Sequence, residues 1–225
     1  MPSFHLPSFL ILAVGVGVAS LAGGNLRAAA DPAPALVATI NGVVDLALGQ
    51  SPATIQERLP QIRTRMSESF AIDVIVQRAF GRNWSRLSPT EQAEAIDLVG
   101  RLIIRTYAIQ LSSGERPVIT VTASREIGPD RHEVVSTVVH QNDTVNVVYR
   151  LGRIDGKWRA YDVLAEGVSV VGNYRQQFDA HFQKNSAAAL LTLLKNKLAA
   201  IPTAKTEHCM IFIATSYHCR GQRGR

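Results

Sequence analysis

The chain has 225 residues, of which 46% are hydrophobic, so it can bury a sizeable core and does not have the composition of a disordered chain. Its 24 basic and 18 acidic residues give a formal net charge of +6. The basic residues are spread along the chain and form no dense arm of the kind that binds nucleic acid, so the charge favours other anionic partners.

An N-terminal apolar run predicts export. Residues 9–22 are almost wholly apolar, and Ala28-Ala29-Ala30 fits the small-residue rule for signal peptidase. The run is too short for a membrane span, which needs about 20 residues. Export also argues against a nucleic-acid partner. The organisation that we expect is a signal peptide (1–30), one folded domain (31–201) and a basic, disordered tail (202–225).

Apolar residues at helical spacing predict that the first half of the domain is helical. Ser51 is a predicted N-cap with Pro52 in the first turn, and Pro60 is expected to break or kink its helix. Ser88 and Glu91 form a predicted capping box that opens the longest helix. The apolar stripe of this helix is wide enough to be covered by a sheet and by another helix or a ligand. The predicted helices span 36–48, 53–69, 70–80 and about 89–111.

The pattern then changes to the alternation of β-strands. In one run, Val145, Val147, Tyr149 and Leu151 share a face, and Asp155-Gly156 after it is a strong hairpin signal. Four strands with short turns predict a four-stranded antiparallel meander, which with N-terminal and C-terminal helices gives the α+β class. The predicted strands span 118–127, 132–140, 144–151 and 157–165, and Ser169 and Ser186 are predicted to cap two further helices.

The sequence contains no pattern typical of a catalytic or metal site. It has neither a phosphate-binding loop nor a Gly-x-Ser-x-Gly elbow, and His132, His140 and His181 have no motif around them. In the tail, His208-Cys209 and His218-Cys219 match no zinc spacing that we know. A disulfide between these two cysteines and a tail with free thiols are both compatible with the sequence. We expect no enzyme activity, no metal and no cofactor.

Motifs spread over the domain carry a resemblance to one family. They are Phe70-x-x-Asp73, Trp84-Ser85-Arg86-Leu87-Ser88-Pro89-Thr90-Glu91-Gln92, Val147-Val148-Tyr149-Arg150-Leu151, Gly156-Lys157-Trp158-Arg159, Tyr161-Asp162-Val163 and Glu166-Gly167-Val168-Ser169-Val170-Val171-x-Asn173-Tyr174-Arg175-x-Gln177-Phe178. Together they resemble the MlaC family of periplasmic phospholipid carriers, also called the toluene-tolerance family. The resemblance covers about residues 36–199, and the last motif is its most specific part.

The resemblance implies a soluble periplasmic protein that binds phospholipid acyl chains in an apolar pocket between sheet and helices. Such a carrier passes lipid between an outer-membrane lipoprotein complex and an inner-membrane ABC transporter with an MCE-domain subunit, and so maintains the lipid asymmetry of the outer membrane. The phospholipid is cargo rather than cofactor. The acyl-chain contacts that we expect are Ile103, Tyr107, Val147, Tyr149, Val163, Val168, Val171, Tyr174 and Phe178.

Polar residues near the last motif are expected to have other tasks. Arg175 is the predicted contact for a phosphate or a protein partner, with an ion pair to Asp162 or Glu166 as the alternative. Asp162 and Asn173 are expected to fix the corner between the fourth strand and the helix that follows. These assignments follow from the resemblance and from the position of the residues beside the Glu166-Gly167 turn.

Solvation energetics agree with the carrier hypothesis. Each buried methylene contributes about 0.8 kcal/mol, so exposing two acyl chains to water costs roughly 20 kcal/mol and a carrier must enclose them. The same apolar stripes could instead form an ordinary filled core. The alternatives left open are a carrier for another lipid such as a hopanoid, a non-catalytic adaptor with a filled core, and a small enzyme on a cone-shaped α+β fold of the nuclear-transport-factor type with His140 or Asp162 facing inward.

Overall fold

The computed structural model describes residues 30–49, 54–111, 115–140 and 143–200. The predicted signal peptide, the predicted tail with both cysteines, and Ser51 and Pro52 lie outside these residues. In chain order the elements are α1 (Ala33–Leu48), α2 (Ile55–Ser67), α3 (Ile72–Phe80), the 3-10 helix η1 (Gly81–Arg86), α4 (Pro89–Leu111), β1 (Val118–Gly128), β2 (Arg131–His140), β3 (Asp143–Ile154), β4 (Lys157–Ala165), β5 (Val168–Ser169), α5 (Val170–Phe182) and α6 (Ala187–Ala200).

The strands form one antiparallel sheet in the order β1-β2-β3-β4-β5. This confirms the α+β class and the meander, but the predicted number of strands was wrong because β5 adds a fifth. The corner at Glu166-Gly167 is in fact a two-residue hairpin turn in which both residues have positive φ, 47° and 78°. Glycine at the second position takes this backbone conformation without steric cost. The turn returns two residues to pair with the end of β4 before α5 begins.

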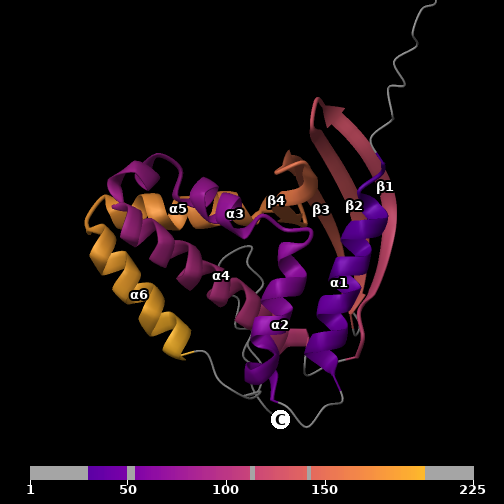
Figure 1. The fold of residues 1–225 in the computed structure, drawn as a ribbon, viewed down its shortest axis with the longest axis horizontal. Coiled ribbons are helices and arrows are strands. Elements are labelled where there is room, and N and C mark those ends of the chain that lie inside the picture. The colour runs from indigo at the N-terminus through magenta and orange to yellow at the C-terminus, as the bar shows by residue number, and fades with distance from the viewer. Residues whose placement is uncertain (1–29, 50–53, 112–114, 141–142, 201–225) are drawn as a thin grey trace, which may run out of the picture. The chain divides into compact units, whose positions relative to one another are not determined.

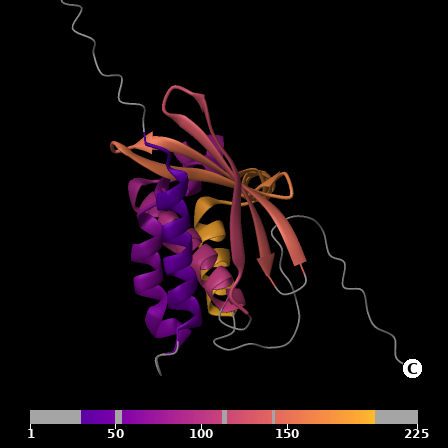
Figure 2. The same ribbon diagram turned by 90° about the vertical axis from the view of Figure 1, so that its right-hand side faces the viewer.

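The register of the sheet defines an inner face that the helices cover. Val134 lies opposite Tyr149, Ser136 opposite Val147, and Val138 opposite Val145. Because side chains alternate along a strand and opposite residues share a face, all six lie on the same face. Figure 1 shows the sheet along one side of the helices, and Figure 2 shows the strands beside the N-terminal helices.

Helix α1 lies against this inner face. Leu36 is buried in a cluster with Val134, Tyr149 and Leu151 from the sheet, which we call the sheet cluster. Phe70 joins it through an edge-to-face contact with Tyr149, with ring centroids 6.3 Å apart. The full set of buried residues in the sheet cluster is Ala33, Leu36, Phe70, Val134, Tyr149, Leu151 and Ala160.

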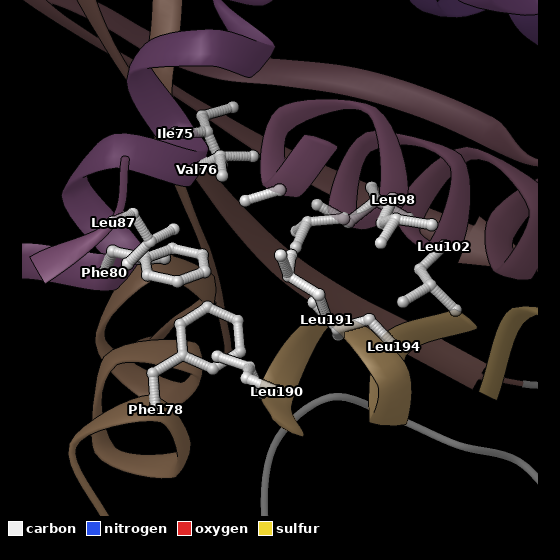
Figure 3. Packing of buried hydrophobic residues seen from close by; sticks show 14 of the residues in the cluster. Ile75, Val76, Phe80, Leu87, Leu98, Leu102, Phe178, Leu190, Leu191 and Leu194 are labelled. Atoms are coloured by element: carbon white, nitrogen blue, oxygen red, sulfur yellow. The ribbon is translucent and has the colours of Figure 1, made fainter. Parts of the chain in front are cut away.

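A second and larger cluster holds the helices to one another, and we call it the helix cluster. Phe80 of α3 is fully buried and packs against Phe178 of α5 with ring centroids 4.5 Å apart. Figure 3 shows these two rings facing one another, while Leu98 and Leu102 of α4 face Leu191 and Leu194 of α6. The cluster is a densely filled apolar core of the kind that stabilises helical packing.

Several helix boundaries differ from the prediction, and the differences in α2 and α3 have a clear structural cause. Helix α2 begins with Thr54 as N-cap, in a capping box with Glu57, and it continues through Pro60 without a break. Pro60 lies in the second turn, where its missing N–H removes a single intrahelical hydrogen bond. Phe70 does not open a helix, because it forms a parallel β-bridge with Ala160, and α3 therefore begins at Ile72. The predicted capping box of Ser88 and Glu91 is confirmed.

The carboxylate of Asp162 fixes the corner between β4 and α5. It is buried, and it accepts hydrogen bonds from Ser169 Oγ at 2.8 Å and from the backbone N–H of Val163 and Val171 at 2.9 and 3.2 Å. The expected role of Asp162 is confirmed. The expected role of Asn173 is wrong, because its side chain accepts from Gln177 within α5.

Asp162 also ends a row of charges on the outer face of the sheet, which we call the outer ladder. Glu133 accepts from Arg125 at 2.8 Å and from Arg150 at 3.2 Å, and Arg150 reaches Asp162 at 3.8 Å. The Arg125 guanidinium, together with that of Arg150, holds the pKa of Glu133 below its usual value against the opposing effect of burial. The ladder thus links four strands across the outer face.

Replacing the buried carboxylate should weaken the corner. We expect Asp162→Ala to lower the free energy of unfolding by about 3 kcal/mol, because two backbone N–H groups and Arg150 lose a buried partner. Urea denaturation followed by circular dichroism measures this loss. The control is Glu126→Ala on β1, an exposed position where a change of at most about 0.5 kcal/mol is expected. Equal stability of the two variants would contradict the role of Asp162.

Candidate functional site

The inner face of the sheet is closed at one end and partly accessible at the other. Val134 and Leu151 are fully buried beneath α1. Along the same face, Val138, Val145 and Val147 are only half-buried. Val121, which lies opposite Ser136 and so on the same face, is 37% exposed. The apolar face therefore continues beyond the part that the helices fill.

Tyr107 lies in the C-terminal part of α4. It keeps 40% of its surface accessible, yet desolvation by surrounding protein raises the pKa of its phenol. High accessibility together with desolvation is typical of a ring in a concave, apolar setting rather than on a convex surface. Ile103 precedes Tyr107 by one helical turn, on the same face of α4, and is buried in the helix cluster.

Two further tyrosines belong to the same region. Burial raises the pKa of Tyr149 to about 12, an effect that the Ser136 hydroxyl opposes and the Tyr107 phenol increases. Burial also raises the pKa of Tyr174 to about 12, again with a smaller contribution from Tyr107. Tyr149 belongs to the sheet cluster, and Tyr174 packs on the helix cluster. We call Tyr107, Tyr149 and Tyr174 the tyrosine group.

The predicted acyl-chain contacts divide between the two clusters. Val147, Tyr149 and Val163 belong to or pack against the sheet cluster, and Val168 lies on the inner face opposite Ala165. Ile103, Val171 and Phe178 are buried in the helix cluster, with Tyr174 packed against it. The partly accessible members are Tyr107, Val147, Val163, Val168 and Tyr174.

Val171 and Phe178 are the predicted contacts most completely enclosed by protein. Phe178 has Phe80 at 4.5 Å and Tyr174 at 5.8 Å between ring centroids, and only 4% of its surface is accessible. Val171 is similarly buried, and its backbone N–H is held by Asp162. In this structure both residues fill the core behind the tyrosine group.

Arg175 makes neither of the two ion pairs considered for it. Its guanidinium donates to the carbonyl oxygen of Arg78 from Nε, at 3.0 Å, and from Nη2. It therefore satisfies a carbonyl at the C-terminal end of α3, as basic side chains commonly do at helix ends. The guanidinium remains exposed, and its contact with a phosphate or a partner stays a prediction.

A separate recess lies between α2, α4 and α6. It has a volume of about 310 Å³ and an apolar base that includes Leu59, Ile104 and Leu198, with Arg63 and Arg101 beside them. Asp97 pairs with both of these arginines, so its single carboxylate offsets one of their two positive charges. None of the predicted acyl-chain contacts lines this recess. Its residues come from three helices distant in the sequence, which is why no local pattern indicated it.

Ser124, His132 and Asp31 come together, but not as a nucleophile and its base. Ser124 Oγ donates to Asp31 Oδ1 at 2.6 Å and lies 2.8 Å from His132 Nε2. The serine proton is therefore held by the carboxylate, whereas an activated serine gives its proton to histidine and the carboxylate orients the other ring nitrogen. Asp31 also accepts from the N–H of Ala33, so the group fastens the start of α1 to the sheet.

The residues that sequence reasoning missed are those whose position depends on strand pairing. Val138 and Val145 lie opposite one another on the accessible inner face, and Ser136 lies between them and Val134. The alternation of β2 indicated that its residues fall on two faces, but the inner face could be identified only once the register with β3 was known.

Among the described residues no helix is long and apolar enough to cross a membrane, and no cluster of metal-binding side chains is found.

Comparisons with known proteins identify relatives of this architecture. The family model described as "MlaC protein" matches residues 40–196. A solved phospholipid-binding protein from Ralstonia solanacearum, in complex with a phospholipid, is similar in structure with a TM-score of 0.67. The two chains are 24% identical, and the match covers 76% of this chain and 98% of that one, which shows a shared fold. A comparison with curated proteins finds no match.

The desolvated phenols should be visible in an alkaline titration. Because the pKa of Tyr149 and Tyr174 is raised from 10.0 to about 12, the folded protein binds these protons more tightly than the unfolded chain. Folding stability should therefore fall as the pH rises between these two values. Ultraviolet titration should show that Tyr149→Phe and Tyr174→Phe each remove one ionisation near pH 12. An unchanged titration in both variants would contradict the desolvation of this site.

Proposed function

We propose that this protein is a phospholipid carrier that shields acyl chains from water. It belongs to the MlaC family, because the family match spans well over half of the chain. The observation that carries this proposal is the apolar inner face of the sheet, which continues past the packed core with Val138, Val145 and Val147 half-buried. A filled core would bury these side chains fully. The phospholipid bound by the Ralstonia solanacearum protein of the same fold supports the choice of cargo.

The predicted acyl-chain contacts are divided between the two clusters, and this division separates residues with accessible surface from residues that protein already encloses. The half-buried residues Val147, Val163 and Val168 can each bury more surface when a chain lies against them, at about 25 cal/mol per Å² of apolar surface. From the helices, Tyr107 and Tyr174 keep accessible surface that cargo can contact. Val171 and Phe178 are buried in the helix cluster, and acyl chains reach them only if that cluster opens.

We further propose that the carrier works in the periplasm between two membrane complexes. The predicted signal peptide supports export, and the net charge of +6 favours contact with anionic membrane surfaces. The family resemblance supports an outer-membrane lipoprotein complex and an inner-membrane ABC transporter with an MCE-domain subunit as partners, and a role in outer-membrane lipid asymmetry. Neither catalysis nor a cofactor is needed for this task, and cargo binding follows from burial of apolar surface alone.

Lipid retained during purification tests the cargo directly. Native mass spectrometry of the exported protein, purified without added lipid, should show a bound mass that matches a phospholipid in an organic extract of the same sample. A hopanoid in the extract would show a different cargo. A protein free of any lipid would favour an adaptor with a filled core.

A bulky side chain on the inner face should block the site. We expect Val147→Trp to reduce lipid retention by about tenfold or more while the protein remains folded, because the indole occupies space next to Tyr149 and Val163. The matched control is Val148→Trp, one residue along the same strand and on the outer face. Quantification of extracted lipid, with thermal denaturation of both variants, measures the effect. Equal retention in the two variants would refute the assignment of the inner face.

A further inference from the structure

Strand β1 forms one edge of the sheet, and its far side is open. Its 11 residues pair with β2, and no other described strand pairs with it. The sheet residues buried in the sheet cluster come from β2, β3 and β4, so α1 covers the strands behind the edge rather than the edge itself. Figure 1 shows β1 along the outer border of the sheet. An edge strand of this length can pair with a further strand unless something blocks it.

Only the second half of β1 carries features that block such pairing. Natural edge strands are usually protected by bulges and charges. In β1 the register with β2 shifts between Val121 and Ala123, and Arg125 and Glu126 follow this bulge. The first half, residues 118–121, pairs regularly with β2 and consists of four β-branched residues without charge. Because β-branched residues favour extended strands, this half of the edge is the part that can accept a partner strand.

Exposed hydrophobic side chains gather at the same half of the edge. Val118 is 61% exposed, Val139 opposite it on β2 is 39% exposed, and Val121 is 37% exposed. Val118 and Val139 lie on the outer face, whereas Val121 lies on the inner face. A strand added to the edge would shield side chains on both faces together with the backbone, whereas a helix would cover one face only. The occupant that fits this edge is therefore another strand.

The first half of β1 is complementary to itself. If two copies pair antiparallel about a two-fold axis at Thr120, Ile119 of each copy lies opposite Val121 of the other, and the two Thr120 side chains lie opposite one another. Cross-strand pairs of β-branched residues and of threonines stabilise a sheet. Five residues from the axis in either direction, Glu115 of one copy would come near Arg125 of the other, and both side chains are exposed. Opposite charges would thus meet at both ends of the paired segment.

We propose that β1 is a dimerisation edge, at which two copies of this chain pair through residues 118–121 and continue the sheet across a two-fold axis at Thr120. The paired segment is short, so the dimer is weak and reversible rather than obligate. Association stops at two copies, because each copy has used its open edge. Val121 belongs both to this edge and to the accessible inner face, so pairing would bring the accessible inner faces of the two copies side by side. The inference goes beyond the carrier function and does not depend on it.

Charges placed at the axis test the pairing. The full mature chain is studied by sedimentation equilibrium, and the weight-average mass of wild type should rise by about 1.5-fold or more between about 10 μM and about 1 mM, as for a weak interface. Thr120→Lys and Thr120→Glu each bring two like charges directly opposite one another, so each variant alone should stay monomeric. An equal mixture of the two variants should associate again, because opposite charges then meet at the axis.

The matched control is Thr137→Lys on β2. Thr137 lies opposite Thr120 on the same outer face, but one strand away from the edge, so this variant should associate like wild type. Circular dichroism verifies that all variants are folded, as expected for an exposed position such as Thr120. A wild type that stays monomeric at the highest concentration would overturn the proposal. Thr120 variants that associate as Thr137→Lys does, or a mixture of them that stays monomeric, would overturn it as well.

Discussion

The buried carboxylate of Asp162 is the interaction on which the site depends. It binds the last residues of β4, the cap residue Ser169 and the first turn of α5, so it fixes the direction in which the chain leaves the sheet. The sheet cluster lies before this corner, and the part of the helix cluster contributed by α5 and α6 lies after it. A change in the corner angle would move α5 relative to the sheet. The position of α5 is therefore fixed by this polar group together with the packing of Phe178 against Phe80.

The two clusters have different tasks because they are filled to different extents. The helix cluster is closed by aromatic and leucine side chains that leave little accessible surface, and it supplies stability. The sheet cluster is complete only beneath α1, and its continuation towards Val138 and Val145 remains half-buried. A carrier needs this combination, because cargo must enter and leave without unfolding the scaffold. The helix cluster thus provides stability, whereas the half-buried continuation of the sheet cluster is available for binding.

Features with a local cause could be predicted from the sequence, and features that depend on pairing could not. The Ser88–Glu91 capping box and the alternation of β3 are encoded within a few residues, and both are confirmed. The two-residue strand β5 is too short for any periodicity. Phe70 lies outside a helix because the residues on either side of it pair with Ala160, about 90 positions along the chain: Ala160 donates to the carbonyl of Ser69 and accepts from the N–H of Ala71. The contact of Arg175 with Arg78 likewise joins elements far apart in sequence.

The outer ladder has a consequence for the empty carrier. Where the inner face is only half-buried, packing specifies strand register less strongly, and a slip of one residue would exchange inner and outer side chains. Here such a slip would move Glu133 and Arg150 into the apolar interior and break their pairing with Arg125 and Asp162. The penalty for desolvating these charges is present whether or not a lipid is bound. Strand alignment is therefore maintained from the solvent side, so under the proposed carrier function the protein would keep its shape between one cargo and the next.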